Sequence, residues 1–264
     1  MNLIDTLATI SASDPAFEPG HVWLAGAGPG HPRYLTLEVA DALSKTDSIV
    51  YDALVSPEVL ALATGSAELH FAGKRGGKPS ETQDNITSTL IRLARSGKKV
   101  LRLKGGDPFI FGRGGEEAEA LVQAGIPCRI LPGMTSAIAA LASARIPATM
   151  RGISRSITFT TGHAAGSEDH LDWHALARLG EPIVVYMGLK MIGEISRLLM
   201  EGGMAAQTPV AVLMAVSTPD ERILLAKLET VEAEVRRQDF AAPALIVIGD
   251  IVPVRKLLTP GQRS

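Results

Sequence analysis

Two glycine-rich loops carry the residues whose types and spacing could do chemistry. The first, Gly26-Ala27-Gly28-Pro29-Gly30, directly follows a short apolar run. The second follows another apolar run and brings Gly105 and Gly106 immediately before Asp107. Adjacent glycines let a ligand approach main-chain atoms closely. A carboxylate at the carboxyl end of a strand lies where open α/β sheets bind ligands, so the loops predict a small-ligand site.

The first loop also invites a dinucleotide-binding interpretation, because Gly26-x-Gly28 follows a strand and Asp52 ends the next one. Two features weaken that interpretation. His31 stands where the third glycine should be, and Pro29 and Pro32 remove amide donors from the turn. A tight turn without any ligand is the structural alternative for the first loop. An aspartate capping a helix entry is the alternative for the second.

Arginines in glycine-flanked or linker-like segments favour an acidic ligand. Arg113, Arg151 and Arg155 all lie in such segments, and a guanidinium group binds carboxylates in a bidentate way. Any one of them taken alone has a solvated surface position as its alternative. Asp52 follows the apolar run 49–51, so we expect it at the ligand-facing edge of the sheet, where it accepts a proton, organises an arginine or caps a turn.

The elements that must position these residues alternate short β-branched strands with longer amphipathic helices, as α/β layers do. We expect helices at 35–44, 80–95, 116–123, 135–144, 192–200 and 231–238. We expect strands at 22–25, 48–51, 67–71, 99–103, 128–131, 157–161, 183–187, 210–214, 223–226 and 245–248. The fold class is therefore α/β, with two domains and a cleft between them.

The proposed boundaries give a flexible tail at 1–20, an N-terminal domain at 21–147, a C-terminal domain at 148–258 and a tail at 259–264. The segment 145–154 lacks periodicity and contains Pro147 and Gly152, so it is the candidate linker.

Composition excludes several classes of protein. The net charge of −2 argues against a general binder of nucleic acid or anionic membranes. Cys128 is the only cysteine, so one chain holds no disulfide and no multi-thiolate metal site, and its apolar setting predicts an unreactive thiol. His170 and His174 have helical ligand spacing but lack a metalloprotease glutamate, and no metal is expected. Without a secretory signal or membrane span, a cytoplasmic location is expected.

Several segments resemble, in order and spacing, the tetrapyrrole methylase superfamily and, within it, the uroporphyrinogen-III C-methyltransferases. The resemblance covers about residues 22–258. The segments are Gly26–Gly30, Val50-Tyr51-Asp52, Gly73-Lys74-Arg75, Arg102–Phe109, Arg113–Glu117, Pro132–Ser136, Thr160–His163 and Tyr186-Met187-Gly188.

The resemblance implies a role for each matching position. Asp52, Lys74 and Arg113 match proposed catalytic positions, and Arg113, Glu116, Arg151 and His163 match substrate-contacting ones. The cofactor contacts carry over onto Pro29, Gly105, Gly106, Asp107, Ile110, Thr135, Ser136 and Met187, with further contacts near Val216, Pro243 and Ala244. Helix capping is the alternative for Thr135 and Ser136, and core packing is the alternative for Met187.

The resemblance also implies a function. A homodimer would transfer methyl groups from S-adenosylmethionine, releasing S-adenosylhomocysteine, to C2 and C7 of uroporphyrinogen III. The product, formed by way of precorrin-1, is precorrin-2, which feeds cobalamin and sirohaem synthesis. Because only a short tail precedes Val22, we expect the dehydrogenase and ferrochelatase module of bifunctional relatives to be absent. The alternatives are a methyltransferase for a later corrinoid such as precorrin-4, a nicotinamide-dependent dehydrogenase, and a non-catalytic tetrapyrrole carrier.

Overall fold

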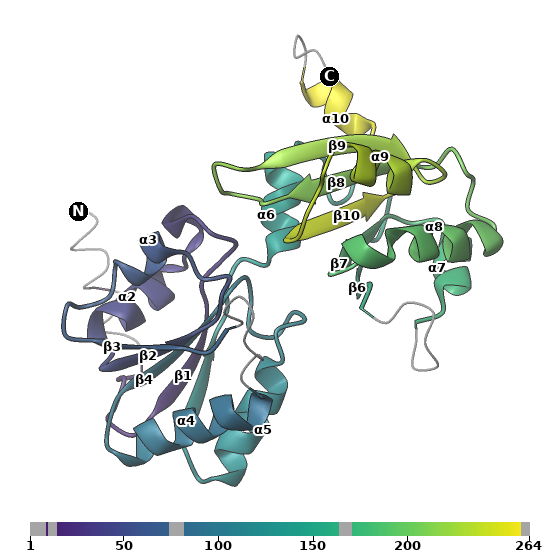
Figure 1. The fold of residues 1–264 in the computed structure, drawn as a ribbon. Helices are drawn as coiled ribbons and strands as arrows, with labels where there is room; N and C mark the ends of the chain where they lie inside the picture. The colour runs from purple at the N-terminus through teal and green to yellow at the C-terminus, as the bar shows by residue number, and fades with distance from the viewer. Residues whose placement is uncertain (1–8, 10–14, 74–81, 164–170, 260–264) are drawn as a thin grey trace. The chain divides into compact units, whose positions relative to one another are not determined.

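The first sheet is built from short apolar runs whose strands all run parallel. The computed structural model describes residues 9, 15–73, 82–163 and 171–259. The strand order is β3-β2-β4-β1-β5 (Figure 1). The strands are β1 (Val22–Gly26), β2 (Ser48–Tyr51), β3 (Glu68–Phe71), β4 (Val100–Lys104) and β5 (Cys128–Leu131). Because the strands are parallel, the segments that follow all of them meet at one edge of the sheet.

Helices cover both faces of this sheet. On one face α2 (Leu37–Lys45) and α3 (Pro57–Leu60) pack over an apolar core, and on the other α4 (Gln83–Arg95) and α5 (Gly114–Gln123) pack over a second. The helix α4 is capped by Thr82, whose hydroxyl accepts a hydrogen bond from the N–H of Asn85 at 3.3 Å. Ser80, where the sequence pattern places the start, lies outside the described residues.

The second sheet is mixed. Its order is β6-β7-β10-β8-β9, with β6 and β7 parallel and every other neighbouring pair antiparallel. Its strands are β6 (Thr158–Thr161), β7 (Ile183–Tyr186), β8 (Pro209–Met214), β9 (Arg222–Lys227) and β10 (Ala244–Ile248). The expected strands are all present, and both sheets carry helices, so the predicted α/β class is confirmed.

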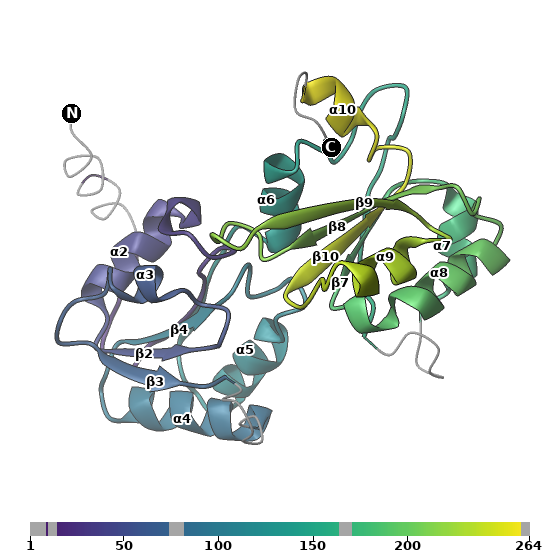
Figure 2. The same ribbon diagram turned by 45° about the horizontal axis from the view of Figure 1, so that its top comes forward.

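Two apolar cores lie on opposite faces of the second sheet. One contains α7 (Trp173–Leu179), α8 (Ile192–Glu201) and α9 (Val231–Arg237), which Figure 2 shows grouped together. The other contains α6 (Ser136–Ser143) and α10 (Val254–Leu258). Short 3-10 turns, η1 (Pro32–Tyr34) and η2 (Leu189–Met191), follow β1 and β7. In the described part of the chain, no helix is long and apolar enough to span a membrane.

The chain divides into two compact units at a different place from the sequence-based boundary. One unit comprises residues 1–136 and the other 137–264, whereas the sequence pattern suggested 147/148. The helix α6 accounts for the difference. Its buried residues Ala137, Ala140 and Leu141 pack with Val184 and Leu213 in the second unit's core. The segment 145–154 therefore lies within the second unit.

Candidate functional site

Three turns at the carboxyl edge of the first sheet pack backbone against backbone. Gly28 and Gly106 exchange hydrogen bonds, with the N–H of Gly28 3.1 Å from the oxygen of Gly106 and the return bond at 2.8 Å. A Cβ atom at Gly26 would lie 2.5 Å from the Gly106 oxygen and 2.6 Å from the Gly133 nitrogen. The turns after β1, β4 and β5 are therefore close enough that only glycine fits between them.

The Asp107 side chain connects two of these turns through hydrogen bonds. Its Oδ1 accepts a hydrogen bond from the N–H of Phe109 at 2.8 Å, and its Oδ2 accepts one from the N–H of Gly133 at 3.0 Å. The first bond shapes the loop after β4, and the second joins that loop to the turn after β5. Asp107, a predicted cofactor-binding residue, thus fixes the backbone to which a ligand could bind.

Asp52 lies beside the same turns. It follows β2, is half-buried, and accepts hydrogen bonds from the N–H of Leu54 at 2.9 Å and of Gly105 at 3.3 Å. The structure therefore brings this predicted catalytic carboxylate next to the predicted cofactor loop. Each of its oxygens keeps a further lone pair for a ligand or a proton.

Four further predicted cofactor residues belong to this edge. Pro29 is half-buried in the turn after β1, and Ile110 is exposed in the loop after β4. Thr135 and Ser136 are half-buried between β5 and α6, and Ser136 is the first residue of α6. All four therefore follow strands that end beside the glycine turns.

Arg113 and Glu116 form a pair at the start of α5. The Arg113 Nη2 lies 2.5 Å from the Glu116 Oε2 and its Nε lies 3.0 Å from Oε1, while both side chains are exposed. Hydrogen bonding between them raises the pKa of Arg113 and lowers the pKa of Glu116. Arg113 has a φ of 59°, a left-handed conformation that is uncommon outside glycine. The pair thus presents an exposed guanidinium group at the end of the loop that follows β4.

Lys74, the remaining catalytic candidate in this unit, lies outside the described residues. Gly73, the last described residue before it, follows β3 and lies against the backbone of Ala53, where a Cβ would approach the Ala53 nitrogen to 2.7 Å. The chain therefore leaves β3 beside the segment that follows Asp52.

The second unit gathers most of its predicted site residues at one edge of its own sheet. Tyr186 and Leu245 are register partners, as are Met214 and Ala244. The ends of β7 and β8 and the start of β10 therefore lie together. Met187, Val216, Pro243, Ala244 and His163 all belong to these segments or to the end of the neighbouring strand β6.

The backbone at this edge is closely packed and strained. The N–H of Gly162 bonds the Tyr186 oxygen at 2.7 Å, and the N–H of Ala215 bonds the Pro243 oxygen at 2.9 Å. Met187 has a φ of 53° and a side chain that is 54% exposed. Core packing, the alternative interpretation of Met187, is therefore excluded for this side chain.

Arg151 lies in a separate turn. The N–H of Met150 bonds the hydroxyl of Ser154 at 3.2 Å and closes this turn, on which Arg151 is exposed. Arg155, the residue after Ser154, donates its N–H to the Glu181 carboxylate. Glu181 precedes β7 and so lies at the opposite end of that strand from Met187. The turn that carries Arg151 therefore precedes the start of β6, whereas His163 follows the end of that strand.

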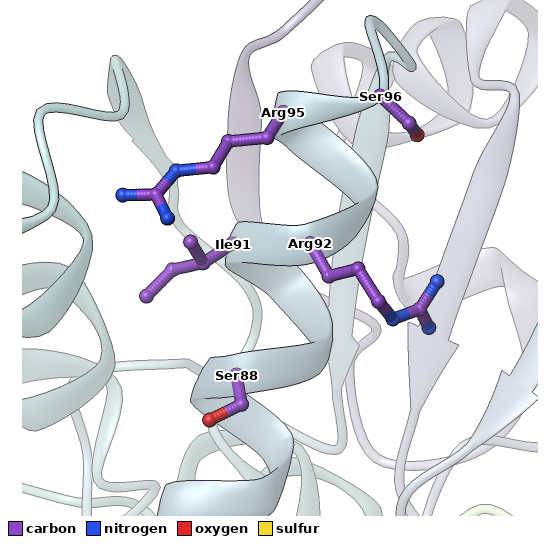
Figure 3. Close-up of a pocket in the computed structure, with 5 residues that line it drawn as sticks. All are labelled: Ser88, Ile91, Arg92, Arg95 and Ser96. Carbon is purple, nitrogen blue, oxygen red and sulfur yellow. The ribbon is translucent and has the colours of Figure 1, made fainter.

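Two surface hollows differ in their relation to these edges. One, of about 610 Å³, is lined by residues that include Ala215, Glu221 and Pro243, so it borders the second unit's predicted site. The other, of about 580 Å³, lies along α4 (Figure 3). It is lined by Ser88, Ile91, Arg92 and Arg95 of that helix and by Ser96, which follows it. The end of α4 leads into the start of β4, so the second hollow lies away from the carboxyl edge.

The turn after β1 also decides against the dinucleotide interpretation. His31 caps the 3-10 turn η1 by accepting a hydrogen bond from the N–H of Arg33 at 3.1 Å, and α2 starts only at Leu37. In a dinucleotide-binding fold the glycine turn opens directly into a helix whose N-terminus faces the pyrophosphate. Here the turn leads into η1 and then to Thr36, the N-cap of α2.

Comparison with known proteins identifies the family. The description "Tetrapyrrole (Corrin/Porphyrin) Methylases" matches residues 21–232. The chain belongs to this family. It is 48% identical over 246 residues to a uroporphyrinogen-III C-methyltransferase from a Sinorhizobium species, covering 92% of this chain and 88% of the relative. The predicted family is therefore confirmed, and the dehydrogenase alternative is not retained.

Other proteins are similar to this chain over part or all of their length. It is 43% identical over 239 residues to a sirohaem synthase from Azotobacter vinelandii, covering 90% of this chain but only 52% of that protein, so it spans about half of such relatives. A Thermus thermophilus uroporphyrin-III C-methyltransferase, crystallised with S-adenosylhomocysteine, matches with a TM-score of 0.76 and 38% identity. The match covers 89% of this chain and 99% of that one. A cobalt precorrin-4 methyltransferase shares the fold, with a TM-score of 0.81 at 24% identity over 91% of this chain and 99% of that one.

One group of buried charged residues beside the methylase's glycine turns was missed by sequence reasoning. Arg102, Lys104 and Glu117 are 2%, 4% and 0% exposed. Their signal was present, because Arg102 and Lys104 alternate within an otherwise apolar strand and so must share a face. Their carboxylate partner lies on the helix after the loop, and spacing alone did not identify it.

Proposed function

We propose that this methylase transfers methyl groups from S-adenosylmethionine to C2 and C7 of uroporphyrinogen III, giving precorrin-2 by way of precorrin-1. The observation that carries the proposal is the backbone packing of the Gly26, Gly106 and Gly133 turns at the carboxyl edge of a parallel sheet. The 48% identity to the Sinorhizobium enzyme supports the choice of substrate.

The residues present suit an adenosyl cofactor held against bare peptide groups. Gly106 has a φ of 71°, and a Cβ there would have no neighbour nearer than the Ser136 nitrogen at 3.7 Å. A side chain at Gly106 would thus need a left-handed backbone and would contact the turn that carries Thr135 and Ser136. S-adenosylmethionine supplies an electrophilic methyl group on a sulfonium sulfur. We assign its binding to Pro29, Gly105, Gly106, Asp107, Ile110, Thr135, Ser136, Met187, Val216, Pro243 and Ala244.

The acidic substrate requires cationic partners. Uroporphyrinogen III carries eight carboxylates, and we assign the substrate contacts to Arg113, Glu116, Arg151 and His163, with Glu116 also orienting Arg113. The bidentate pair with Glu116 favours one orientation of the guanidinium plane before a substrate carboxylate arrives. Ordering the group in advance reduces the side-chain entropy lost on binding.

Catalysis requires alignment and a proton acceptor. A reduced pyrrole carbon is electron-rich and attacks the methyl group directly, so holding the reactants in line supplies about 7–11 kcal/mol. The alkylated ring must then lose a proton to a base. We assign Asp52 to this part of the site because it combines a carboxylate with a hydrogen bond to the Gly105 N–H. Lys74 and Arg113 complete the proposed catalytic set.

We further propose that the methylase is a cytoplasmic homodimer whose product enters cobalamin or sirohaem synthesis. The resemblance to the family supports the dimer, and light scattering coupled to size-exclusion chromatography tests it. A mass of one chain at micromolar concentration would contradict it.

One assay tests the function. The purified protein is incubated without oxygen with uroporphyrinogen III and S-adenosylmethionine, and the macrocycle is analysed by mass spectrometry. We expect two added methyl groups and matching release of S-adenosylhomocysteine. An unmodified macrocycle, in the presence of a control enzyme of proven activity that modifies it, would contradict the proposal. Incubation with precorrin-4 tests the later-corrinoid alternative under the same conditions.

A further inference from the structure

A buried cluster of charged residues lies between β4 and α5. The Glu117 Oε1 accepts hydrogen bonds from the Arg102 Nη2 at 3.2 Å, the Lys104 Nζ at 3.0 Å and the Gln83 Nε2 at 2.9 Å. The Arg102 Nη1 also bonds the Val50 oxygen at 3.3 Å, so the cluster joins α4, α5, β4 and β2. Charged groups are seldom fully buried unless paired in this way.

The cluster joins the two ends of the loop that carries the proposed site. Lys104 is the last residue of β4 and is followed directly by the glycine pair, while Glu117 lies on the first turn of α5. Between them lies the segment 105–116, within which Phe111 and Arg113 have φ values of 53° and 59°. Such conformations persist only where the surrounding structure fixes them. The hydrogen bond between Lys104 and Glu117 directly connects the two ends of this segment.

The charges of the cluster extend to Asp52. Burial and the neighbouring Arg102 lower the pKa of Lys104, while Glu117 and then Asp52 act to raise it. Burial acts to raise the pKa of Glu117, but the charges of Arg102 and Lys104 outweigh it and the pKa is lowered. Two buried cations therefore face one buried carboxylate, and Asp52 supplies the second negative charge while bonding the N–H of Gly105.

We propose that Glu117 is a positioning residue for methyl transfer. By holding Lys104 and Arg102, it fixes the glycine turn that binds the cofactor relative to the Arg113–Glu116 pair that binds the substrate. It reaches neither ligand itself, because its side chain is 0% exposed. The assignment of ligands to these residues rests on the proposed function.

The test compares Glu117→Gln with Glu119→Gln. The first variant keeps the size of the side chain and removes the buried negative charge. The second makes the same change on the exposed face of α5, where Glu119 bonds only the nearby Gln123 at 3.2 Å among the described contacts. Circular dichroism first establishes that both variants are folded at the assay temperature. Calorimetry then gives the S-adenosylhomocysteine affinity, and steady-state kinetics give kcat and KM.

We expect Glu117→Gln to weaken S-adenosylhomocysteine binding about tenfold and to lower kcat by on the order of 100-fold at saturating cofactor, as for a displacement of about 1 Å. Glu119→Gln should match the wild type. If Glu117 contributed only to global stability, Glu117→Gln would keep the wild-type kcat at temperatures well below its unfolding temperature. Folded Glu117→Gln with wild-type affinity and kcat would overturn the proposal.

Glu117→Asp keeps the test decisive if Glu117→Gln does not fold. It preserves the charge but shortens the side chain by one methylene, so the hydrogen bonds from Lys104 and Gln83 should lengthen. We expect reduced kcat from this variant, and wild-type kcat would overturn the proposal. Calorimetry with S-adenosylhomocysteine needs no tetrapyrrole. A loss of affinity with Glu117→Gln would therefore stand even if uroporphyrinogen III proved not to be the substrate.

Discussion

Replacing Gly26 by alanine is the most direct perturbation of the packed turns. The added Cβ would lie 2.5 Å from the Gly106 oxygen and 2.6 Å from the Gly133 nitrogen, whereas ordinary contacts begin at 3.4 Å. Both neighbours are backbone atoms, so the turns after β4 and β5 must each move by about 0.9 Å. Overpacking of this kind destabilises a protein by about 1–3 kcal/mol.

The same displacement acts on function, because the moved turns carry the proposed cofactor contacts. We expect Gly26→Ala to lower the free energy of unfolding by about 1–3 kcal/mol. Movement of the turns by roughly 1 Å should also reduce the rate of methyl transfer by on the order of 100-fold. Urea unfolding measures the first quantity, and calorimetry with S-adenosylhomocysteine together with single-turnover kinetics measures the second.

Gly65→Ala is the matched control. A Cβ at Gly65 would meet no atom within 4 Å, so this change should leave stability and turnover near wild type. A Gly26→Ala protein that unfolds at the same urea concentration as wild type and binds S-adenosylhomocysteine equally well would refute the reasoning. It would mean that the three turns are not packed as the structure has them.

Three further changes test separate contacts. Asp107→Asn replaces one carboxylate oxygen by an amide nitrogen and so loses the bond to either Phe109 or Gly133. It should destabilise the protein by about 1.5–3 kcal/mol and weaken S-adenosylhomocysteine binding, as urea unfolding and calorimetry will show. Arg113→Ala should lower kcat/KM for the tetrapyrrole while the cofactor affinity stays near wild type; an equal loss of both would indicate a structural role. For Glu117 the folded pKa lies below 4.5, so its carboxylate stabilises the fold above pH 4.5, and this contribution is lost as the pH falls through the folded pKa. Urea unfolding against pH should therefore show a steeper acid loss in wild type than in Glu117→Gln, and parallel curves would contradict the assignment.

Strands and most long helices were predictable because local sequence determines them. The runs 48–51 and 183–186 are apolar and β-branched, and they became buried strands. Cys128, predicted in a strand, lies half-buried in β5, and burial raises its pKa to about 11, consistent with an unreactive thiol. The helices α3, α7 and α10 were not predicted, and α3 and α10, with four and five residues, carry too few turns to show a 3.6-residue period.

The unit boundary was not predictable for a different reason. The run 137–142 reads as a helix in either unit, and its small apolar side chains do not indicate which core receives them. Contacts with Val184 and Leu213 assign the helix to the second unit. Val184 and Leu213 lie far from this helix in sequence, so no local sequence pattern predicts the contact. The same holds for Glu117, whose partners Arg102 and Lys104 lie across the glycine loop.

The candidate site separates into backbone and side-chain parts with different constraints. The proposed cofactor part depends on glycines whose Cβ positions are already filled by neighbouring backbone, so Gly26 and Gly133 leave almost no room for change. The proposed substrate part depends on exposed side chains such as Arg113 and Glu116, which pair with each other at the surface and so can be replaced at small structural cost. Substitution should therefore alter tetrapyrrole preference far more readily than cofactor preference.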